Sequence, residues 1–212
     1  MYPFIYLASQ SPRRQELLKQ IGIRFELLTP EFGEDTESLE TPLENEKAQT
    51  YVKRVTLIKC EAAKNRWREK GVPWAPILSA DTTVSLGGIP FAEILGKPID
   101  EGDAYRMLKI LSGKRHQVLT CVAVLHDIQE TPVVFIQTSE VEFGTLSEQQ
   151  IASYISSKEP FGKAGGYGIQ GLGGALIRSI QGSYSGIMGL PLYETSQLLI
   201  NLNVVCPLLT NP

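Results

Sequence analysis

The segment FIYLASQSPRRQELLKQIGIRFELLT, residues 4–29, decides the fold class. The apolar run that opens it predicts a buried strand. Ser11 followed by Pro12 is typical of a helix N-cap and a first helical residue, and Gly22 is typical of a helix end. Residues 23–29 predict a second strand. A strand, a tight loop, a helix and another strand in succession indicate an α/β protein.

The pattern continues toward the middle of the chain. The stretch TPLE at 41–44 forms a capping box and predicts a helix that runs to about Lys70, either continuous or broken in two. Residues 76–86 begin apolar and become polar, which predicts a strand that leaves the core and carries Asp81 at its end. Asp100 predicts the N-cap of a further amphipathic helix.

The second half of the chain also alternates strands and helices. Residues 116–126 and 132–144 predict neighbouring antiparallel strands. Ser147 predicts the start of a helix through another capping box. A β-hairpin is expected to turn at 181–182, and Pro191 opens the last helix.

Composition bounds the class of protein. The chain has 212 residues, of which 42% are hydrophobic and 20% charged, as is typical of a globular protein. We expect a single domain over residues 1–212 with a loose tail at 203–212. The formal net charge of −3 argues against a nucleic-acid polymer as partner, because such binders carry a basic face. No apolar run is long enough for a membrane span, and the first residues carry no signal-peptide pattern.

Cysteine and histidine are too sparse for the commonest metal and redox sites. Cys60, Cys121 and Cys206 lie far apart and form no C-x-x-C pair. Two histidines are too few for a histidine-built metal site, and no G-x-S-x-G elbow is present. An odd, sparse set of cysteines is typical of a reducing compartment, so we expect a soluble cytoplasmic protein.

The loop before the first helix is a candidate anion site. The free N–H groups and the dipole at a helix start favour negative charge. Arg13 and Arg14 lie in the first turn, where cations are normally disfavoured, and a bound anion would explain them. Two surface arginines on a capped helix explain them equally well.

Other polar residues suit phosphate chemistry. Asp81 follows an apolar run, and a carboxylate so placed is typical of a Mg²⁺ ligand or of a base that orients water; a turn former or helix cap is the alternative. Lys59, Lys97 and Lys163 are each typical of solvated surface lysines when taken alone. Together with Arg13 they would form a positive cluster that suits a polyphosphate.

The glycine-rich stretch at 162–174 matches no known phosphate loop. It contains neither G-x-x-x-x-G-K-[ST] nor a complete G-x-G-x-x-G, which argues against ATPases, GTPases and Rossmann oxidoreductases. Gln170 can both donate and accept hydrogen bonds, which suits the edge of a base. A glutamine at a strand edge is the alternative.

Six ordered motifs over about residues 4–200 resemble the Maf family. They are LASQSPRR (7–14), SADTT (79–83), LGKP (95–98), LSG with His116 (111–116), KAGGYGIQG (163–171) and GLPL with Glu194 and Thr195 (189–195). The resemblance implies an α/β fold: an elongated, mixed, twisted sheet flanked by helices, with two lobes about a central cleft, as in inosine-triphosphate pyrophosphatases. It also implies nucleoside triphosphate pyrophosphatase activity in a house-cleaning role, a divalent cation (Mg²⁺ or Mn²⁺) and commonly a homodimer.

The same resemblance assigns roles to individual residues. Asp81 matches the catalytic proton acceptor for water and, with Glu34, the metal ligands. The polar positions around the triphosphate and metal are Ser9, Arg13, Glu34, Lys59, Lys97 and Lys163. Arg13, Thr82 and Gln170 match the subgroup that acts on dTTP and UTP, with Thr82 and Gln170 reading the pyrimidine edge.

Two departures from the family pattern keep alternatives open. Gly162 replaces an aspartate that usually precedes Lys-Ala-Gly, and residues 88–93 form a longer hairpin than usual. A nucleotide-binding regulator of septum formation and cell division, with little hydrolysis, is one alternative to the enzyme. A pyrophosphatase for 7-methyl-GTP or purine triphosphates on the same scaffold is the other, which Arg13, Thr82 and Gln170 disfavour.

Overall fold

One mixed sheet forms the centre of the molecule. The computed structural model describes residues 1–30, 40–87 and 93–207, and seven strands of this part make up the sheet. The elements in chain order are β1 (Ile5–Leu7), α1 (Pro12–Gln20), β2 (Phe25–Leu27), α2 (Ala48–Lys70), β3 (Ile77–Leu86), β4 (Glu93–Leu95), α3 (Glu101–Leu111), β5 (Arg115–Leu125), β6 (Val133–Phe143), α4 (Glu148–Ser156), η2 (Ala164–Gly166), η3 (Leu172–Leu176), β7 (Ile177–Gln181), α5 (Tyr184–Met188) and α6 (Leu192–Asn201).

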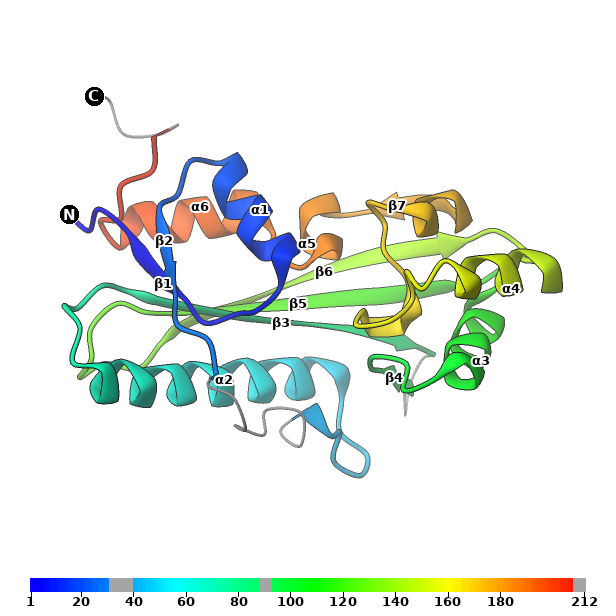
Figure 1. Cartoon of the computed structure of the whole chain (residues 1–212), viewed down its shortest axis with the longest axis horizontal. Helices are drawn as coiled ribbons and strands as arrows, with labels where there is room; N and C mark the ends of the chain where they lie inside the picture. The colour runs from blue at the N-terminus through cyan, green and yellow to red at the C-terminus, as the bar shows by residue number, and fades with distance from the viewer. Residues whose placement is uncertain (31–39, 88–92, 208–212) are drawn as a thin grey trace.

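The sheet is parallel at one edge and antiparallel over the rest. Its order is β2-β1-β3-β5-β6-β7, with β4 paired to β3 off this path. β1 runs parallel to β2 and β3, whereas β3, β5, β6 and β7 pair antiparallel. The long strands β3, β5 and β6 extend along the molecule, with α2 on one face and α1 and α6 on the other (Figure 1). The predicted α/β fold with a mixed sheet flanked by helices is confirmed.

Two of the buried apolar clusters lie toward opposite ends of the sheet, and two further clusters include residues of α2. At one end Leu108 of α3, Phe143 of β6 and Ile151 of α4 belong to one buried cluster. At the other end Leu18 of α1 and Leu199 of α6 belong to a second cluster. This division gives the two lobes that the sequence led us to expect.

Two predicted helix caps and one predicted strand pair are confirmed. The side chain of Asp100 accepts a hydrogen bond from the backbone N–H of Asp103 and caps α3. Ser147 and Gln150 form a reciprocal capping box at the start of α4. The strands predicted at 116–126 and 132–144 pair antiparallel as β5 and β6.

The predicted helix start at 41–44 is wrong. The long helix begins at Ala48 and runs unbroken to Lys70. Glu46 takes the place of the expected capping carboxylate, because it accepts from the N–H of Leu43 at 3.0 Å and pairs with Arg54 at 2.7 Å. This ion pair to the first turns of α2 holds 41–44 outside the helix.

The predicted hairpin at 181–182 and part of the predicted loose tail are also wrong. β7 pairs back onto β6, and Ser183 then caps α5 by accepting from the N–H of Gly186. In the tail, Val204 bridges to Tyr2 and is buried. Residues 208–212 and most of the longer hairpin predicted at 88–93 lie outside the described residues.

None of the described helices combines the length and the apolar character that a membrane crossing requires.

Candidate active site

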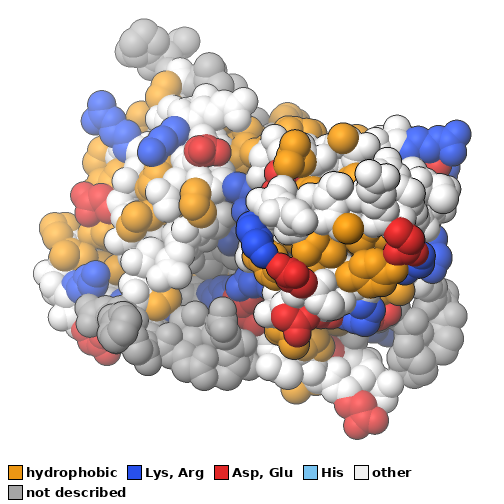
Figure 2. Space-filling view, turned by 45° about the vertical axis from the view of Figure 1, so that its right-hand side comes forward, with side chains coloured by type: hydrophobic (Ala, Val, Ile, Leu, Met, Phe, Trp, Pro, Cys, Tyr) orange, Lys and Arg blue, Asp and Glu red, His pale blue; other side chains and the backbone are white. Residues whose placement is uncertain are grey.

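A pocket opens where the sheet is incomplete beside β3. β1 pairs with β3 as far as Leu78, and β4 pairs with it only from Val84 onward. Among the described strands, the edge of β3 between these points therefore has no partner on this side. A cavity of about 430 Å³ lies there, and Lys and Arg side chains surround the hollow between the two halves of the molecule (Figure 2).

Asp81 reaches this pocket from the middle of β3. The expectation that it ends a strand is wrong, because β3 continues to Leu86 and pairs with both β5 and β4. Side chains alternate between the faces of a strand, so Asp81 points toward Lys59 of α2 while Thr82 points toward Arg14 of α1. The unpaired edge, rather than a strand end, gives both side chains access to the cavity.

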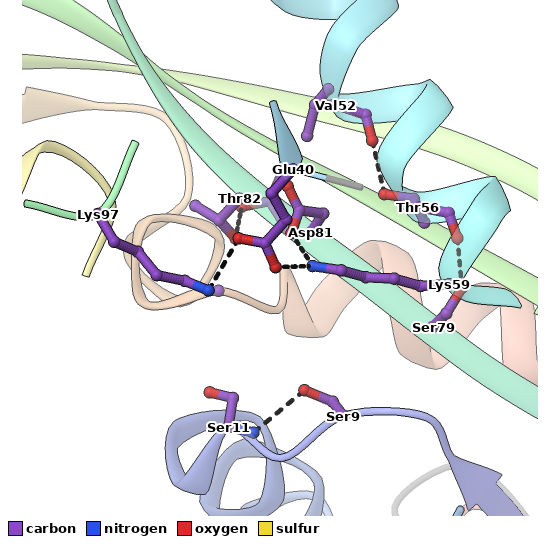
Figure 3. A network of polar contacts seen from close by, with 12 residues as sticks. Ser9, Ser11, Glu40, Val52, Thr56, Lys59, Ser79, Asp81, Thr82 and Lys97 are labelled. Atoms are coloured by element: carbon purple, nitrogen blue, oxygen red, sulfur yellow. Dashed lines mark hydrogen bonds and ion pairs between the residues drawn. The ribbon is translucent and has the colours of Figure 1, made fainter. Parts of the chain in front are cut away.

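Oppositely charged side chains meet on the α2 side of the pocket. The ammonium of Lys59 lies 2.6 Å from Asp81 Oδ1 and 2.7 Å from Glu40 Oε1. Lys97, just after β4, lies 2.8 Å from the other oxygen of Glu40. Figure 3 shows the two lysines approaching the carboxylates from opposite sides. We call Glu40, Lys59, Asp81 and Lys97 the charged side of the pocket.

Glu40 is a residue that the sequence analysis missed. It joins the two lysines expected to bind phosphate, Lys59 and Lys97. Burial alone would raise the pKa of Glu40, but the ion pairs with Lys59 and Lys97 outweigh it and lower the pKa. The phenol of Tyr51 donates to the backbone carbonyl of Glu40 at 2.7 Å and fixes this position.

Hydrogen bonds to uncharged oxygen atoms organise the opposite side of the pocket around a buried arginine. Arg14 donates through Nε to the carbonyl of Gly189 at 2.8 Å, and through its two terminal nitrogens to Ser9 Oγ and Thr82 Oγ1 at 3.2 Å each. Thr82 Oγ1 also lies 2.9 Å from Thr120 Oγ1. We call Ser9, Arg14 and Thr82, which line the cavity, together with Thr120 behind them, the hydroxyl side. Arg14 thus joins the first loop, β3 and the segment after α5.

Arg13 and Lys163 complete the positive lining of the pocket. Burial lowers the pKa of Arg13, with Glu16 opposing this effect. Burial also lowers the pKa of Lys163, and the charge of Arg13 lowers it further. Two cations that repel one another in a half-buried position are suited to an anionic ligand, which favours the anion-site interpretation of the first loop for Arg13. Arg14 instead serves the protein's own hydrogen bonds.

The glycine-rich loop after α4 is wrapped around one carboxylate. Glu159 accepts from the N–H groups of Leu172 at 2.8 Å and Gly173 at 2.9 Å, and from the phenol of Tyr154 at 2.9 Å. A Cβ at Gly171 would lie 2.3 Å from Glu159 Oε2, so glycine is required there by the close approach. The amide hydrogen bonds outweigh the burial of Glu159 and lower its pKa.

This loop presents two of the predicted residues to the pocket. Lys163 donates to the backbone carbonyl of Glu159, and Gln170 lies at the exposed rim of the cavity. Gly162 has a positive φ of 71°, and a Cβ there would meet nothing within 4 Å. The space would therefore accept the usual aspartate, but the backbone conformation of Gly162 favours glycine.

The predicted site residues within the described part of the chain all line this one pocket. They are Ser9, Arg13, Lys59, Asp81, Thr82, Lys97, Lys163 and Gln170. Glu34 lies outside the described residues. The residues that sequence reasoning missed are Glu40, Thr120 and Glu159; none carries a local signal beyond its charge or its hydroxyl group, and their contacts arise from the tertiary fold. Arg14 was named in the candidate anion site, but its hydrogen bonds go to Gly189, Ser9 and Thr82.

The carboxylates of the charged side are suited to a hard divalent cation. Among residues 1–30, 40–87 and 93–207, no group of three or more His, Cys, Asp or Glu side chains could hold a metal ion on its own. Mg²⁺ is commonly held by one or two carboxylates together with substrate phosphates and water. Asp81 and Glu40 already place oxygens around a single positive charge, the ammonium of Lys59, so these residues fit such an ion.

The family match and the similar sequences agree with one another. Residues 4–202 match the family described as "Maf-like protein". The dTTP/UTP pyrophosphatase of Ralstonia nicotianae is 55% identical over 93% of this chain and 93% of that protein. Those of Burkholderia lata and Albidiferax ferrireducens are each 52% identical over 94% of this chain, covering 93% and 96% of those proteins. Among solved structures, the Ham1 protein of Staphylococcus aureus aligns with a TM-score of 0.40 and 18% identity over 66% of this chain and 71% of that chain.

Proposed function

Because the chain belongs to the Maf family, we propose that it hydrolyses dTTP and UTP to the nucleoside monophosphate and pyrophosphate. The observation that carries this proposal is the convergence of two carboxylates, three lysines and Arg13 on a single cavity. Relatives that are half identical or more over nearly their whole length are named for the same substrates. The substrate assignment follows from that similarity, and the chemistry follows from the pocket.

Asp81 is the proposed general base. Its Oδ1 accepts from Lys59 at 2.6 Å, which holds the carboxylate in one orientation against the cavity. In that orientation Asp81 accepts the proton of a water that attacks a phosphorus of the substrate. Lys59, Lys97, Lys163 and Arg13 bind the phosphates and stabilise the negative charge that grows on the departing pyrophosphate.

Asp81 and Glu40 are the described residues that would hold a divalent cation, and Glu34 remains a predicted ligand. Such an ion, when bound, neutralises phosphate charge and lowers the pKa of water. Within this chain, the two carboxylates orient the site and the lysines compensate them when no substrate is bound. Assembly as a homodimer and a cytoplasmic location remain part of the same proposal.

A panel of nucleoside triphosphates tests the proposal. Pyrophosphate release is measured with Mg²⁺ or Mn²⁺ on dTTP, UTP, CTP, the purine triphosphates and 7-methyl-GTP. We expect dTTP and UTP to be the best substrates, and Asp81→Asn to lose about 10²–10⁴-fold in kcat while remaining folded. Preference for a purine or for 7-methyl-GTP would overturn the substrate assignment. Nucleotide binding without hydrolysis would instead favour the regulator of cell division.

A further inference from the structure

The hydrogen bonds of two threonine hydroxyls on neighbouring strands allow each hydroxyl to be assigned as donor or acceptor. Thr82 of β3 and Thr120 of β5 are register partners, and their Oγ1 atoms lie 2.9 Å apart. Thr120 is 0% exposed, and its hydroxyl donates to the carbonyl of Gly186 at 2.8 Å. A threonine hydroxyl has only one proton to donate. Thr120 therefore accepts from Thr82, and the proton of Thr82 points at Thr120.

Arg14, which lies beside the two threonines, uses one lone pair of the Thr82 hydroxyl. Arg14 donates to Thr82 Oγ1 at 3.2 Å, and a guanidinium cannot accept a hydrogen bond. Thr82 Oγ1 has thus used its proton and one lone pair within the protein. Thr82 also lines the cavity, so the one capacity it has left toward a ligand is that of a hydrogen-bond acceptor.

We infer that Thr120 fixes the hydroxyl of Thr82 as an acceptor toward the base, so that the pocket selects pyrimidines with a proton on ring nitrogen N3. This inference rests on the proposed function. Uracil and thymine carry an N3–H donor, whereas N3 of cytosine is an acceptor. Thr82 can accept a hydrogen bond from the N3–H of uracil or thymine. With cytosine, the remaining lone pair of Thr82 would face the lone pair of N3, which is repulsive. The resemblance already implies that Thr82 faces the base; the new element is that Thr120 and Arg14 act as positioning residues that fix the hydrogen-bonding role of Thr82.

Gln170 cannot supply this discrimination by itself. Its amide presents a donor on one side and an acceptor on the other, and rotation of the amide exchanges them. Gln170 lies at the exposed rim, and no described contact fixes its amide in one orientation. Thr82, whose hydroxyl is fixed by hydrogen bonds, therefore decides whether the pocket offers the base a donor or an acceptor.

The substitution Thr120→Val tests the inference from outside the pocket. Thr120 is not one of the residues that line the cavity, and valine has nearly the same shape without the hydroxyl. In this variant the proton of Thr82 loses its acceptor and can turn toward the base, so cytosine becomes acceptable. We expect the ratio of kcat/KM for UTP over CTP to fall about tenfold relative to the unsubstituted protein. Thr120→Ser keeps a hydroxyl and should restore the ratio.

Matched variants separate this effect from a general loss of packing. Thr56→Val removes another fully buried threonine hydroxyl, which donates to the carbonyl of Val52 in α2, and should leave the ratio unchanged. If Thr120→Val does not fold, Thr82→Val removes the acceptor itself and should lower the same ratio. An unchanged ratio in the folded variant, with UTP still hydrolysed, overturns the inference and leaves the proposed function standing.

Binding measurements distinguish failure of the inference from failure of the proposed function. The dissociation constants of UMP and CMP are measured by calorimetry for the same variants. If no triphosphate is hydrolysed but Thr120→Val still reduces the preference for UMP over CMP, the proposed function fails and the inference stands. If both the kinetic and the binding preferences are insensitive to Thr120, the inference is refuted.

Discussion

The two sides of the pocket are prepared for a ligand in opposite ways. On the charged side, each ammonium or carboxylate already has a partner from the protein at 2.6 to 2.8 Å, and a triphosphate must exchange those partners for its own oxygens. On the hydroxyl side, Arg14 and Thr120 fix the donor and acceptor roles without any ligand. Under the proposed function, strength and selectivity are therefore assigned to different sides of the pocket: the exchangeable charges bind phosphate, and the fixed hydrogen-bond pattern selects the base.

The largest test of this comparison removes the central charge. Lys59→Met takes away the ammonium that joins Asp81 and Glu40 while keeping the length of the side chain. We expect kcat/KM for UTP to fall about 10²–10³-fold, because a group that stabilises developing phosphate charge is lost. The ratio of UTP to CTP turnover should stay the same, since the hydroxyl side is untouched.

Lys53 supplies the control for that variant. It is exposed on the same helix and lies outside the pocket lining, so Lys53→Met should keep the original rate. A loss of less than tenfold in Lys59→Met, measured on protein with an unchanged thermal midpoint, would contradict the role of Lys59.

Acid should weaken the lobe that contains α3 and α4 through His116, whose ring packs against Phe143 and Tyr167. Burial lowers the pKa of His116 to about 4, and its Nε2 lies 2.8 Å from the phenol of Tyr167, which lines the pocket. Because the pKa in the folded state lies below the ordinary value near 6.5, the neutral ring stabilises the fold above about pH 6.5. That stability is lost as the pH falls from about 6.5 toward 4, and amounts to about 3 kcal/mol in all.

Urea unfolding between pH 7 and pH 5 measures this effect. His116→Phe should flatten the dependence of the free energy of unfolding on pH in that range. His126→Phe changes the other histidine of the chain and controls for the substitution itself. An equal slope in the protein and in His116→Phe would show that protonation of His116 is not coupled to unfolding.

Glu159→Gln probes how firmly the glycine-rich loop holds its two pocket residues. The new amide group must face one of the backbone N–H donors of Leu172 and Gly173, so one hydrogen bond to the loop is replaced by a repulsive contact. We expect KM for UTP to rise about tenfold with a smaller change in kcat, because Lys163 and Gln170 shift while Asp81 does not.

Glu148→Gln is the matched change on the exposed face of α4. There Glu148 pairs with Lys109 and accepts from Tyr105 at the surface, away from the pocket, and KM should stay as it was. If KM in Glu159→Gln is equally unaffected, the carboxylate does not position the loop.

Features that depend on neighbouring residues could be predicted from the sequence, whereas contacts between distant segments could not. The caps at Asp100 and Ser147 depend on residues a few positions apart, so their patterns sufficed. Motif resemblance also brought Asp81, Lys59 and their neighbours to one pocket. Glu40 and Thr120 could not be found this way: each is defined by contacts between segments that only the fold brings together, 19 positions apart for Glu40 and Lys59 and 66 for Thr120 and Gly186. Asp81 was placed at a strand end because the unpaired edge of β3 depends on where β1 stops and β4 begins.

Glu40→Gln gives the smallest expected change and separates two roles on the charged side. If Glu40 holds the divalent cation together with Asp81, the neutral amide binds it less tightly, and the Mg²⁺ concentration for half-maximal activity should rise about threefold to tenfold, in line with one weakened charged ligand. The rate at saturating Mg²⁺ should change little, because Asp81 and Lys59 remain. Glu44→Gln, an exposed carboxylate near by in the sequence, should behave as the unsubstituted protein. The opposite result, an unchanged Mg²⁺ requirement with a lower KM for UTP, would mean that Glu40 only neutralises Lys59 and Lys97 and competes with the phosphates for them.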